Sequence, residues 1–123
     1  SECVTNAALN YGYSIILSAF NREVTANGYL TQIGLFHDNM FNYFNLSCDM
    51  MEPFRVLVDR KVKGTDYGSF GTNEKHDIIS ILNDTVEIDG VKQNVLNAIK
   101  IYCRSVFEAL NDGDASEIKF YRI

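Results

Sequence analysis

Much of the chain shows the three-to-four-residue spacing of apolar side chains that is typical of α-helices. Over residues 5–27 this spacing predicts a long helix that Thr5 caps and Asn27-Gly28 ends. Over residues 95–110 it predicts a strongly amphipathic helix that ends at Asp112-Gly113. The apolar members of the two helices are Leu9, Tyr13, Ile16, Leu17 and Phe20, and then Val95, Leu96, Ile99, Tyr102, Cys103, Val106, Phe107 and Leu110.

Between these helices the pattern is less regular. Residues 28–39 fit an irregular connection, and residues 40–62 form a second helical stretch. Pro53 has no amide to bond the Asp49 carbonyl, so this stretch must bend or restart there. Three glycines within residues 64–71 predict a flexible loop. The loop lacks the Gly-Lys-Ser/Thr ending of a phosphate-binding loop, so we assign it no nucleotide.

The rest of the chain predicts short elements. Residues 73–82 favour a helix, and residues 85–92 alternate apolar and polar side chains around Asp89-Gly90, a pair typical of hairpin turns. Residues 118–121 favour a short terminal strand. The predicted fold class is therefore mainly α: a single helical domain with a small β-hairpin and a short terminal strand.

Composition sets the broad class of protein. The chain has 123 residues, 46% of them hydrophobic, and only one proline, which suits one domain around one core. Its three cysteines are an odd number, which favours a reducing cytoplasm with the thiols acting as small buried hydrophobes. No apolar run reaches membrane-spanning length, so we expect a cytoplasmic protein without a membrane partner.

Charge changes this picture in one segment. Sixteen acidic against eleven basic residues give a net charge of -5, which excludes a nucleic-acid binder that works through bulk positive charge. Residues 55–63 are the exception, with four basic residues against one acid. The basic residues of this run are Arg55, Arg60, Lys61 and Lys63.

Candidate metal ligands directly precede the basic run. Asp49 and Glu52 lie three residues apart on a predicted helix, so they are expected to share one face. His37 lies fifteen residues before Glu52, a distance of about 22 Å along a straight helix. The chain must therefore turn back for all three to share an ion. One imidazole with carboxylates suits Mn²⁺, which accepts nitrogen ligands better than Mg²⁺ does.

The same residues also have a plainer interpretation. An acidic pair at this spacing is more often a solvated helix face than a metal site. Arg55 can pair with Glu52 or Asp59, and the basic run suits the carboxyl end of a helix dipole as well as it suits DNA phosphates. His76, near a helix start, is expected to be exposed. Composition and spacing alone thus indicate a helical domain with a candidate metal site.

Four motifs in order and at characteristic spacing resemble those of the CRISPR adaptation integrase family, the CRISPR-associated endonucleases that insert new spacers. The resemblance covers residues 5–62. The asparagine-rich stretch that includes Asn39, Asn42 and Asn45 resembles the type II subfamily. The four motifs are Leu9-Asn10-Tyr11-Gly12-Tyr13-Ser14, Ile33-Gly34-Leu35-Phe36-His37, Asp49-Met50-Met51-Glu52-Pro53-Phe54-Arg55 and Val58-Asp59.

The resemblance implies a helical catalytic domain that binds Mn²⁺ or Mg²⁺ through a glutamate, a histidine and a second acid. On this chain the histidine is His37 and the second acid is Glu52, both catalytic, with Asp49 as an additional acid. The family's upstream glutamate and its amino-terminal β-rich domain have no counterpart in residues 1–123. The expectation is therefore a carboxy-terminal catalytic domain that is inactive, or nearly so, by itself.

The activity implied is metal-assisted phosphoryl transfer, which joins the 3′-hydroxyl of a protospacer to the CRISPR repeat. The basic residues of 55–63 would steady the DNA. The implied partners are DNA, a second copy in a homodimer, the small partner adaptation protein and, in type II systems, the effector nuclease and an accessory ring protein. The alternative is a non-catalytic helical protein-interaction module that docks through the apolar stripe of residues 95–110.

Overall fold

The fold is that of a computed structural model, which describes residues 1–31 and 40–123, with side chains described for residues 1–27 and 45–123. The α-helices of these ranges are α1 (Glu2–Thr31), α2 (Met40–Met50), α3 (Arg55–Lys63), α4 (Thr72–Ile79) and α5 (Val95–Asp112). The 3₁₀ helices are η2 (Glu52–Phe54), η3 (Ser80–Asn83) and η4 (Ala115–Glu117), and the strands are β1 (Thr85–Ile88), β2 (Val91–Asn94) and β3 (Tyr121–Arg122). The predicted mainly α class, with a small sheet, is confirmed.

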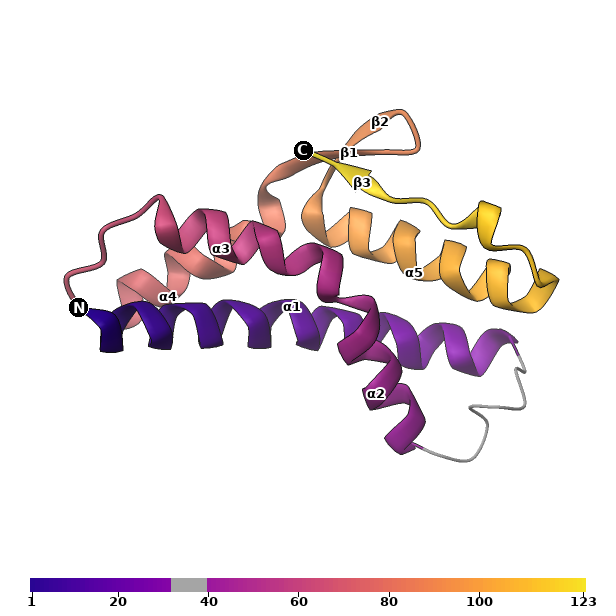
Figure 1. Cartoon of the computed structure of the whole chain (residues 1–123), viewed down its shortest axis with the longest axis horizontal. Coiled ribbons are helices and arrows are strands. Elements are labelled where there is room, and N and C mark those ends of the chain that lie inside the picture. The colour runs from indigo at the N-terminus through magenta and orange to yellow at the C-terminus, as the bar shows by residue number, and fades with distance from the viewer. Residues whose placement is uncertain (32–39) are drawn as a thin grey trace.

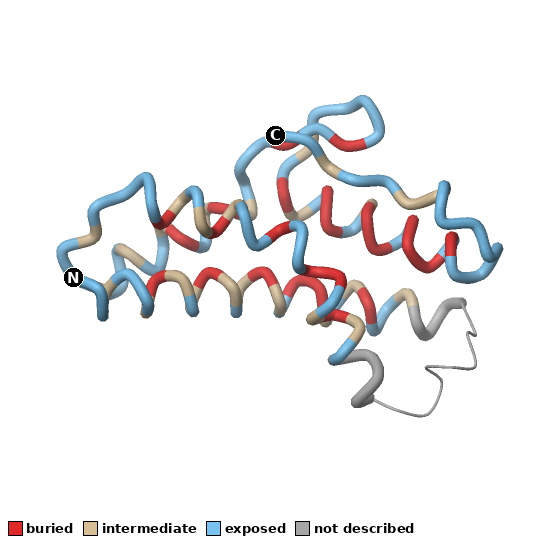
Figure 2. Tube along the Cα trace, viewed as in Figure 1, coloured by how far each residue is buried: buried red, intermediate tan, exposed pale blue. Residues whose placement is uncertain are grey.

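Helix α1 is the central element, and the other helices pack along it (Figure 1). α3 and α4 contact its amino-terminal part, α5 lies beside its carboxy-terminal part, and α2 lies across it. Buried positions recur along α1 and α5, which enclose much of the core between them (Figure 2).

The face of α1 that enters the core is built around small residues. Ala8, Gly12 and Ile16 are buried, whereas Leu9 and Tyr13, two members of the predicted apolar face, are only partly buried. A Cβ on Gly12 would overlap Cγ1 of Val58, so only glycine lets α3 approach this closely.

Both predicted ends of α1 were wrong. The helix begins at Glu2 rather than at Thr5, and the Ser1 hydroxyl accepts a hydrogen bond from the Val4 amide at 3.3 Å. It continues beyond Asn27-Gly28 to Thr31. Asn27 donates to the Glu23 carbonyl at 2.7 Å within the helix, and one glycine costs only about 1 kcal/mol in a helix interior.

The predicted interruption at Pro53 is confirmed, and it takes the form of a restart. α2 ends at Met50, and Pro53 lies in the first turn of η2, where its missing amide costs least. Phe54, at the end of η2, is fully buried, with its ring centroid 5.2 Å from that of Phe20 and 5.6 Å from that of Tyr102. This anchor holds the start of α3 against the core.

The hairpin prediction is also confirmed. β1 and β2 pair antiparallel with Ile88 opposite Val91, and the turn residues Asp89 and Gly90 have φ of 56° and 78°, the left-handed pair that a two-residue hairpin requires. β3 adds to the other edge of β1, in the order β2-β1-β3. It begins later than the predicted 118–121, at Tyr121, because Tyr121 pairs with Ile88, the last residue of β1, and residues 118–120 lie beyond the end of that strand.

The cysteines only partly follow their predicted role. Cys103 is buried in the core, and burial raises the pKa of its thiol. Cys3 is exposed and Cys48 is half-buried, so the prediction of buried thiols was wrong for these two. None of the described helices is long and apolar enough to cross a membrane.

Candidate functional site

The two predicted acidic ligands lie on separate helical segments. Asp49 is in the last turn of α2, whereas Glu52 opens η2, so the prediction that a single helix carries both was wrong. The break follows from Pro53, which cannot continue the hydrogen-bond ladder of α2. Both carboxylates are exposed, and 63% of the Glu52 side chain is accessible.

Arg55, the first residue of α3, lies between Glu52 and an aromatic ring. Its Nε is 3.4 Å from Oε1 of Glu52, which confirms the predicted pairing. Its guanidinium carbon lies 4.7 Å from the centroid of the Tyr13 ring, a cation–π contact. Because 46% of the side chain stays accessible, the guanidinium has donors left for a ligand in solvent.

Tyr13 is itself held by α3. Its hydroxyl donates to Oδ1 of Asp59, across 46 residues of sequence. The accepting carboxylate, with burial, raises the pKa of Tyr13 above its usual value. The ring is thereby fixed beneath Arg55. The sequence motifs contain Tyr13 and Asp59, but the sequence predicted Tyr13 only as part of an apolar helix face and Asp59 only as a candidate partner of Arg55. Their contact with each other was not predicted, since only the α1–α3 packing at Gly12 brings them together.

The carboxy-terminal strand β3 also contacts the turn that carries Glu52. The Tyr121 hydroxyl on β3 donates to the Pro53 carbonyl at 2.5 Å. The Tyr121 ring centroid lies 4.5 Å from that of Phe54. β3 thus holds the turn that presents Glu52, a contact that no local sequence signal indicated.

The basic run divides in the structure. Lys61 lies 3.7 Å from Oδ1 of Asp77 and donates to the Ser80 hydroxyl at 3.3 Å, with only 24% of its side chain accessible. Arg60 and Lys63 are exposed. His76 is exposed on α4, as predicted.

The predicted metal ligands are only partly placed. His37 lies outside the described residues, and within the described ranges no cluster of three or more His, Cys, Asp or Glu residues is placed to hold an ion. Asp49 and Glu52 nevertheless offer solvent-facing carboxylate oxygens, the donors that Mg²⁺ and Mn²⁺ prefer. The donor chemistry of the described residues therefore fits the expected ion.

The apolar stripe of α5 faces the core and is not a docking surface along most of its length. Val95, Ile99, Cys103 and Phe107 are buried. Leu110, at the end of the stripe, is the exception, with 49% of the residue exposed.

Comparison with known proteins decides the family. Residues 4–65 match the sequence profile of the family described as CRISPR associated protein Cas1. The chain belongs to the Cas1 family. The match contains every residue of the Glu52–Arg55–Tyr13–Asp59 arrangement.

Curated Cas1 relatives extend this result. The CRISPR-associated endonuclease Cas1 of Neisseria meningitidis serogroup C (strain 8013) is 32% identical over 96% of this chain and 40% of its own length. This match fits the type II subfamily that the sequence led us to expect. CRISPR-associated protein Cas1 3 of Methanobrevibacter ruminantium is 40% identical over 48% of the chain and 18% of its own length. CRISPR-associated endonuclease Cas1 1 of Archaeoglobus fulgidus is 40% identical over 48% of this chain and 17% of its own length. The chain thus spans about two fifths or less of these relatives.

Proposed function

We propose that this chain is the helical catalytic part of a metal-dependent DNA endonuclease and integrase that inserts spacers into a CRISPR array. The reaction is phosphoryl transfer: the 3′-hydroxyl oxygen of a protospacer bonds to the phosphorus of a phosphodiester at the repeat, and the deoxyribose 3′ oxygen on the other side of that phosphorus leaves. Membership of the Cas1 family supports this, as do the endonuclease names of two relatives.

The observation that carries the proposal is the exposed Glu52–Arg55 pair on the rigid Tyr13–Asp59 support. The planar guanidinium of Arg55 can make a bidentate contact with phosphate oxygens, and stacking on Tyr13 reduces the conformational freedom that Arg55 must lose on binding. Glu52 stands beside it as an oxygen ligand. Arg55, which can bind a phosphate, and Glu52, which can bind a metal ion, therefore lie side by side. Phosphoryl transfer requires both kinds of contact near the reacting phosphorus.

The roles of individual residues follow. His37 and Glu52 hold the divalent ion, with Asp49 as an additional acid, and a bound ion supplies Lewis-acid polarisation of a phosphoryl oxygen. Arg55 contacts the phosphate beside the ion, and Arg60 and Lys63 steady the flanking backbone. Lys61 contributes least, because Asp77 already neutralises it.

The proposed partners remain those that the family resemblance implies. They are the protospacer and repeat DNA, a second copy of the protein and the small partner adaptation protein. In type II systems the effector nuclease and the accessory ring protein take part as well.

Metal binding tests the ligand assignment on the chain itself. Titration of Mn²⁺ followed by electron paramagnetic resonance should show at least tenfold weaker binding for Glu52→Gln and His37→Ala. Asp66→Asn, which removes an exposed acid from loop 64–71, is the matched control and should bind as the parent does. Measurable Mn²⁺ binding that is equal in all four proteins would contradict the assignment.

Strand joining tests the activity. A chimera carries residues 1–123 in place of the aligned segment of the Neisseria meningitidis relative. It should join protospacer ends to a repeat duplex in Mn²⁺, and Glu52→Gln should abolish the joining. A joining-competent Glu52→Gln chimera would refute the catalytic role of Glu52.

A further inference from the structure

The turn that carries Glu52 is short. The helix η2 has three residues, and its N-cap residue, Met51, has an apolar side chain that cannot cap it. The Phe54 amide donates to the Met51 carbonyl at 2.8 Å, and the Arg55 amide donates to the Glu52 carbonyl. A single 3₁₀ turn is not stable alone, because ordering its backbone costs more free energy than its hydrogen bonds gain. The position of Glu52 therefore depends on contacts from elsewhere in the chain.

One such contact comes from β3. The Tyr121 hydroxyl donates to the Pro53 carbonyl at 2.5 Å, across 68 residues of sequence. The Tyr121 ring also packs on the side chain of Phe54, with the ring centroids 4.5 Å apart and the ring planes at 42°. Tyr121 thus contacts the two residues that directly follow Glu52 in the chain.

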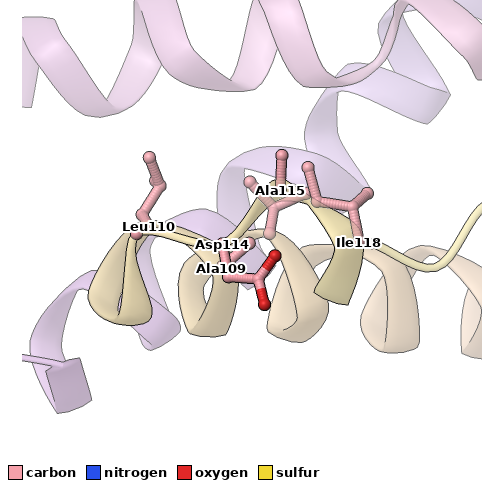
Figure 3. A pocket seen from close by; sticks show the side chains of 7 residues that line it. Ala109, Leu110, Asp114, Ala115 and Ile118 are labelled. Atoms are coloured by element: carbon pink, nitrogen blue, oxygen red, sulfur yellow. The ribbon is translucent and has the colours of Figure 1, made fainter.

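Tyr121 is itself anchored by the sheet and by α5. It pairs with Ile88, a buried residue of β1. The Lys119 amide, two residues earlier, donates at 2.9 Å to the hydroxyl of Ser105, which is buried on α5. Ile118 lies against the end of α5, where it lines a small pocket together with residues of that helix (Figure 3). Residues 118–121 are therefore fixed to the core, and Tyr121 gives the Glu52 turn a firm support.

Glu52 needs such a support in order to bind an ion. Its side chain is 63% accessible, and its ion pair with Arg55 is exposed and weak. A metal ligand must be held within about 0.5 Å of its working position. Because the Glu52 side chain faces solvent, the backbone of the turn has to supply much of this precision. Residues that hold a ligand from behind typically change metal affinity or activity by about ten- to a hundredfold when they are removed.

We propose that Tyr121 is a positioning residue for Glu52: its hydroxyl fixes the Pro53 carbonyl, and with it the backbone from which Glu52 reaches the divalent ion. Tyr121 touches neither the ion nor the DNA in this arrangement. It lies outside residues 4–65, the part of the chain that matches the Cas1 profile. The proposal rests on the proposed function, in which Glu52 is a metal ligand.

Hydrogen exchange on the metal-free chain, followed by nuclear magnetic resonance, tests whether Tyr121 holds the turn. Tyr121→Phe keeps the ring on Phe54 and removes only the hydroxyl. The amides of Phe54 and Arg55 should then exchange about fivefold faster, as expected when one hydrogen bond is lost. 4-Aminophenylalanine at position 121 carries an N–H donor in place of the hydroxyl and should restore slow exchange.

Tyr67→Phe is the matched control, because it removes another tyrosine hydroxyl bond, the one to Asp77 at 2.6 Å. It should leave the exchange of the Phe54 and Arg55 amides within about twofold of the parent. Unchanged exchange in Tyr121→Phe would overturn the proposal. Equal acceleration in Tyr121→Phe and Tyr67→Phe would also overturn it, since that result would show a general loss of stability.

The chimera with the Neisseria meningitidis relative tests the consequence for the ion. In Tyr121→Phe the Mn²⁺ concentration that gives half-maximal strand joining should rise about tenfold, while the KM for DNA stays within about twofold. A purely structural role would lower the amount of active protein and leave this Mn²⁺ concentration unchanged. Tyr67→Phe should leave it unchanged, and 4-aminophenylalanine at position 121 should restore the parent value.

The two measurements separate this proposal from the proposed function. A parent chimera that joins no DNA at any Mn²⁺ concentration would refute the proposed function. The exchange measurement needs neither metal nor DNA, so it would still decide whether Tyr121 holds the turn. Faster exchange in Tyr121→Phe combined with an unchanged Mn²⁺ requirement in an active chimera would reject the positioning role and leave the proposed function standing.

Discussion

The chain uses one polar device twice, a tyrosine hydroxyl that donates to an aspartate, with opposite results for the cation nearby. In the first region Tyr13 on α1 donates to Asp59 on α3. Arg55 lies over the Tyr13 ring and remains 46% accessible at the surface. The tyrosine here is a platform, and the cation on it faces solvent.

In the second region the tyrosine closes a loop. Tyr67, in loop 64–71, donates to Oδ2 of Asp77 on α4 at 2.6 Å. Oδ1 of the same carboxylate pairs with Lys61, whose side chain is only 24% accessible. Asp77 here binds both Tyr67 and Lys61, so the charge of Lys61 is paired within the fold.

The difference shows that a basic run in the sequence is not one functional surface. Arg55 and Lys61 are six residues apart on one helix, and the helical period turns them to different faces. One packs toward α1 and the site, and the other toward α4.

The largest effect is expected at the helix contact beneath the first region. Gly12→Val should lower the free energy of unfolding by about 3 kcal/mol, because its side chain would overlap Val58. Gly68→Val in the second region should change it by less than about 0.5 kcal/mol, since no atom lies within 4 Å of an added Cβ. Urea unfolding measures both. A Gly12→Val midpoint equal to that of the parent would rule out the close packing of α1 and α3.

The next effect separates the two cations. Under the proposed function, Arg55→Ala should weaken duplex DNA binding in Mn²⁺ about tenfold, or about 1.4 kcal/mol. Lys61→Ala should weaken it less than about twofold, while losing more stability than Arg55→Ala does, because it leaves Asp77 without its cation. Fluorescence anisotropy and urea unfolding provide the two readouts. Equal losses of DNA affinity in Arg55→Ala and Lys61→Ala would contradict the view that only Arg55 is available to DNA.

A smaller effect appears at alkaline pH. Burial and the hydrogen bond to Asp77 raise the pKa of Tyr67 to about 12. The unfolded phenol ionises near pH 10, so this contribution to stability is complete below pH 10 and is lost as pH rises from about 10 through about 12. Solvent screening limits it to about 1 kcal/mol.

Tyr67→Phe should therefore flatten the decline of stability between pH 9 and 11.5, as urea unfolding at each pH can measure. Tyr13, whose pKa is also raised, contributes with the same sign, so Tyr13→Phe is the comparison variant. An unchanged slope in Tyr67→Phe would exclude this explanation.

The smallest effect concerns the exposed ion pair. Glu52→Gln should cost at most about 0.5 kcal/mol of stability, since an exposed pair at this spacing is weak. The difference from the parent should vanish in 1 M salt. A loss above about 1 kcal/mol would mean that Glu52 serves the fold rather than a ligand.

Sequence alone predicted the elements whose cause is local. Pro53 required a break, because it has no amide, and Asp89-Gly90 required a hairpin turn, because both residues adopt positive φ. The ends of α1 were misjudged for a related reason. Gly28 is a weak signal for the end of a helix. The free energy that one glycine costs a helix is smaller than the free energy that the rest of the helix gains by continuing.

The candidate site was predicted less completely. Motif spacing identified Glu52 and Arg55 and their pairing, whereas the break before Glu52 separated it from the helix of Asp49. The hydrogen bond between Tyr13 and Asp59 was not predicted because 46 residues separate them. The metal role of His37, a residue outside the described ranges, stays a prediction.

What the sequence determined by itself was the helical class, the break at Pro53, the hairpin and, through its motifs, the Cas1 family. These features depend on backbone chemistry and on residue patterns that are short in sequence, so neighbouring residues are enough to predict them. Only the tertiary structure decided which charges serve a ligand. The packing at Gly12 brings Asp59 to Tyr13, and Asp77 captures Lys61. Availability of a side chain depends on its partners in space, and these lie far away along the chain.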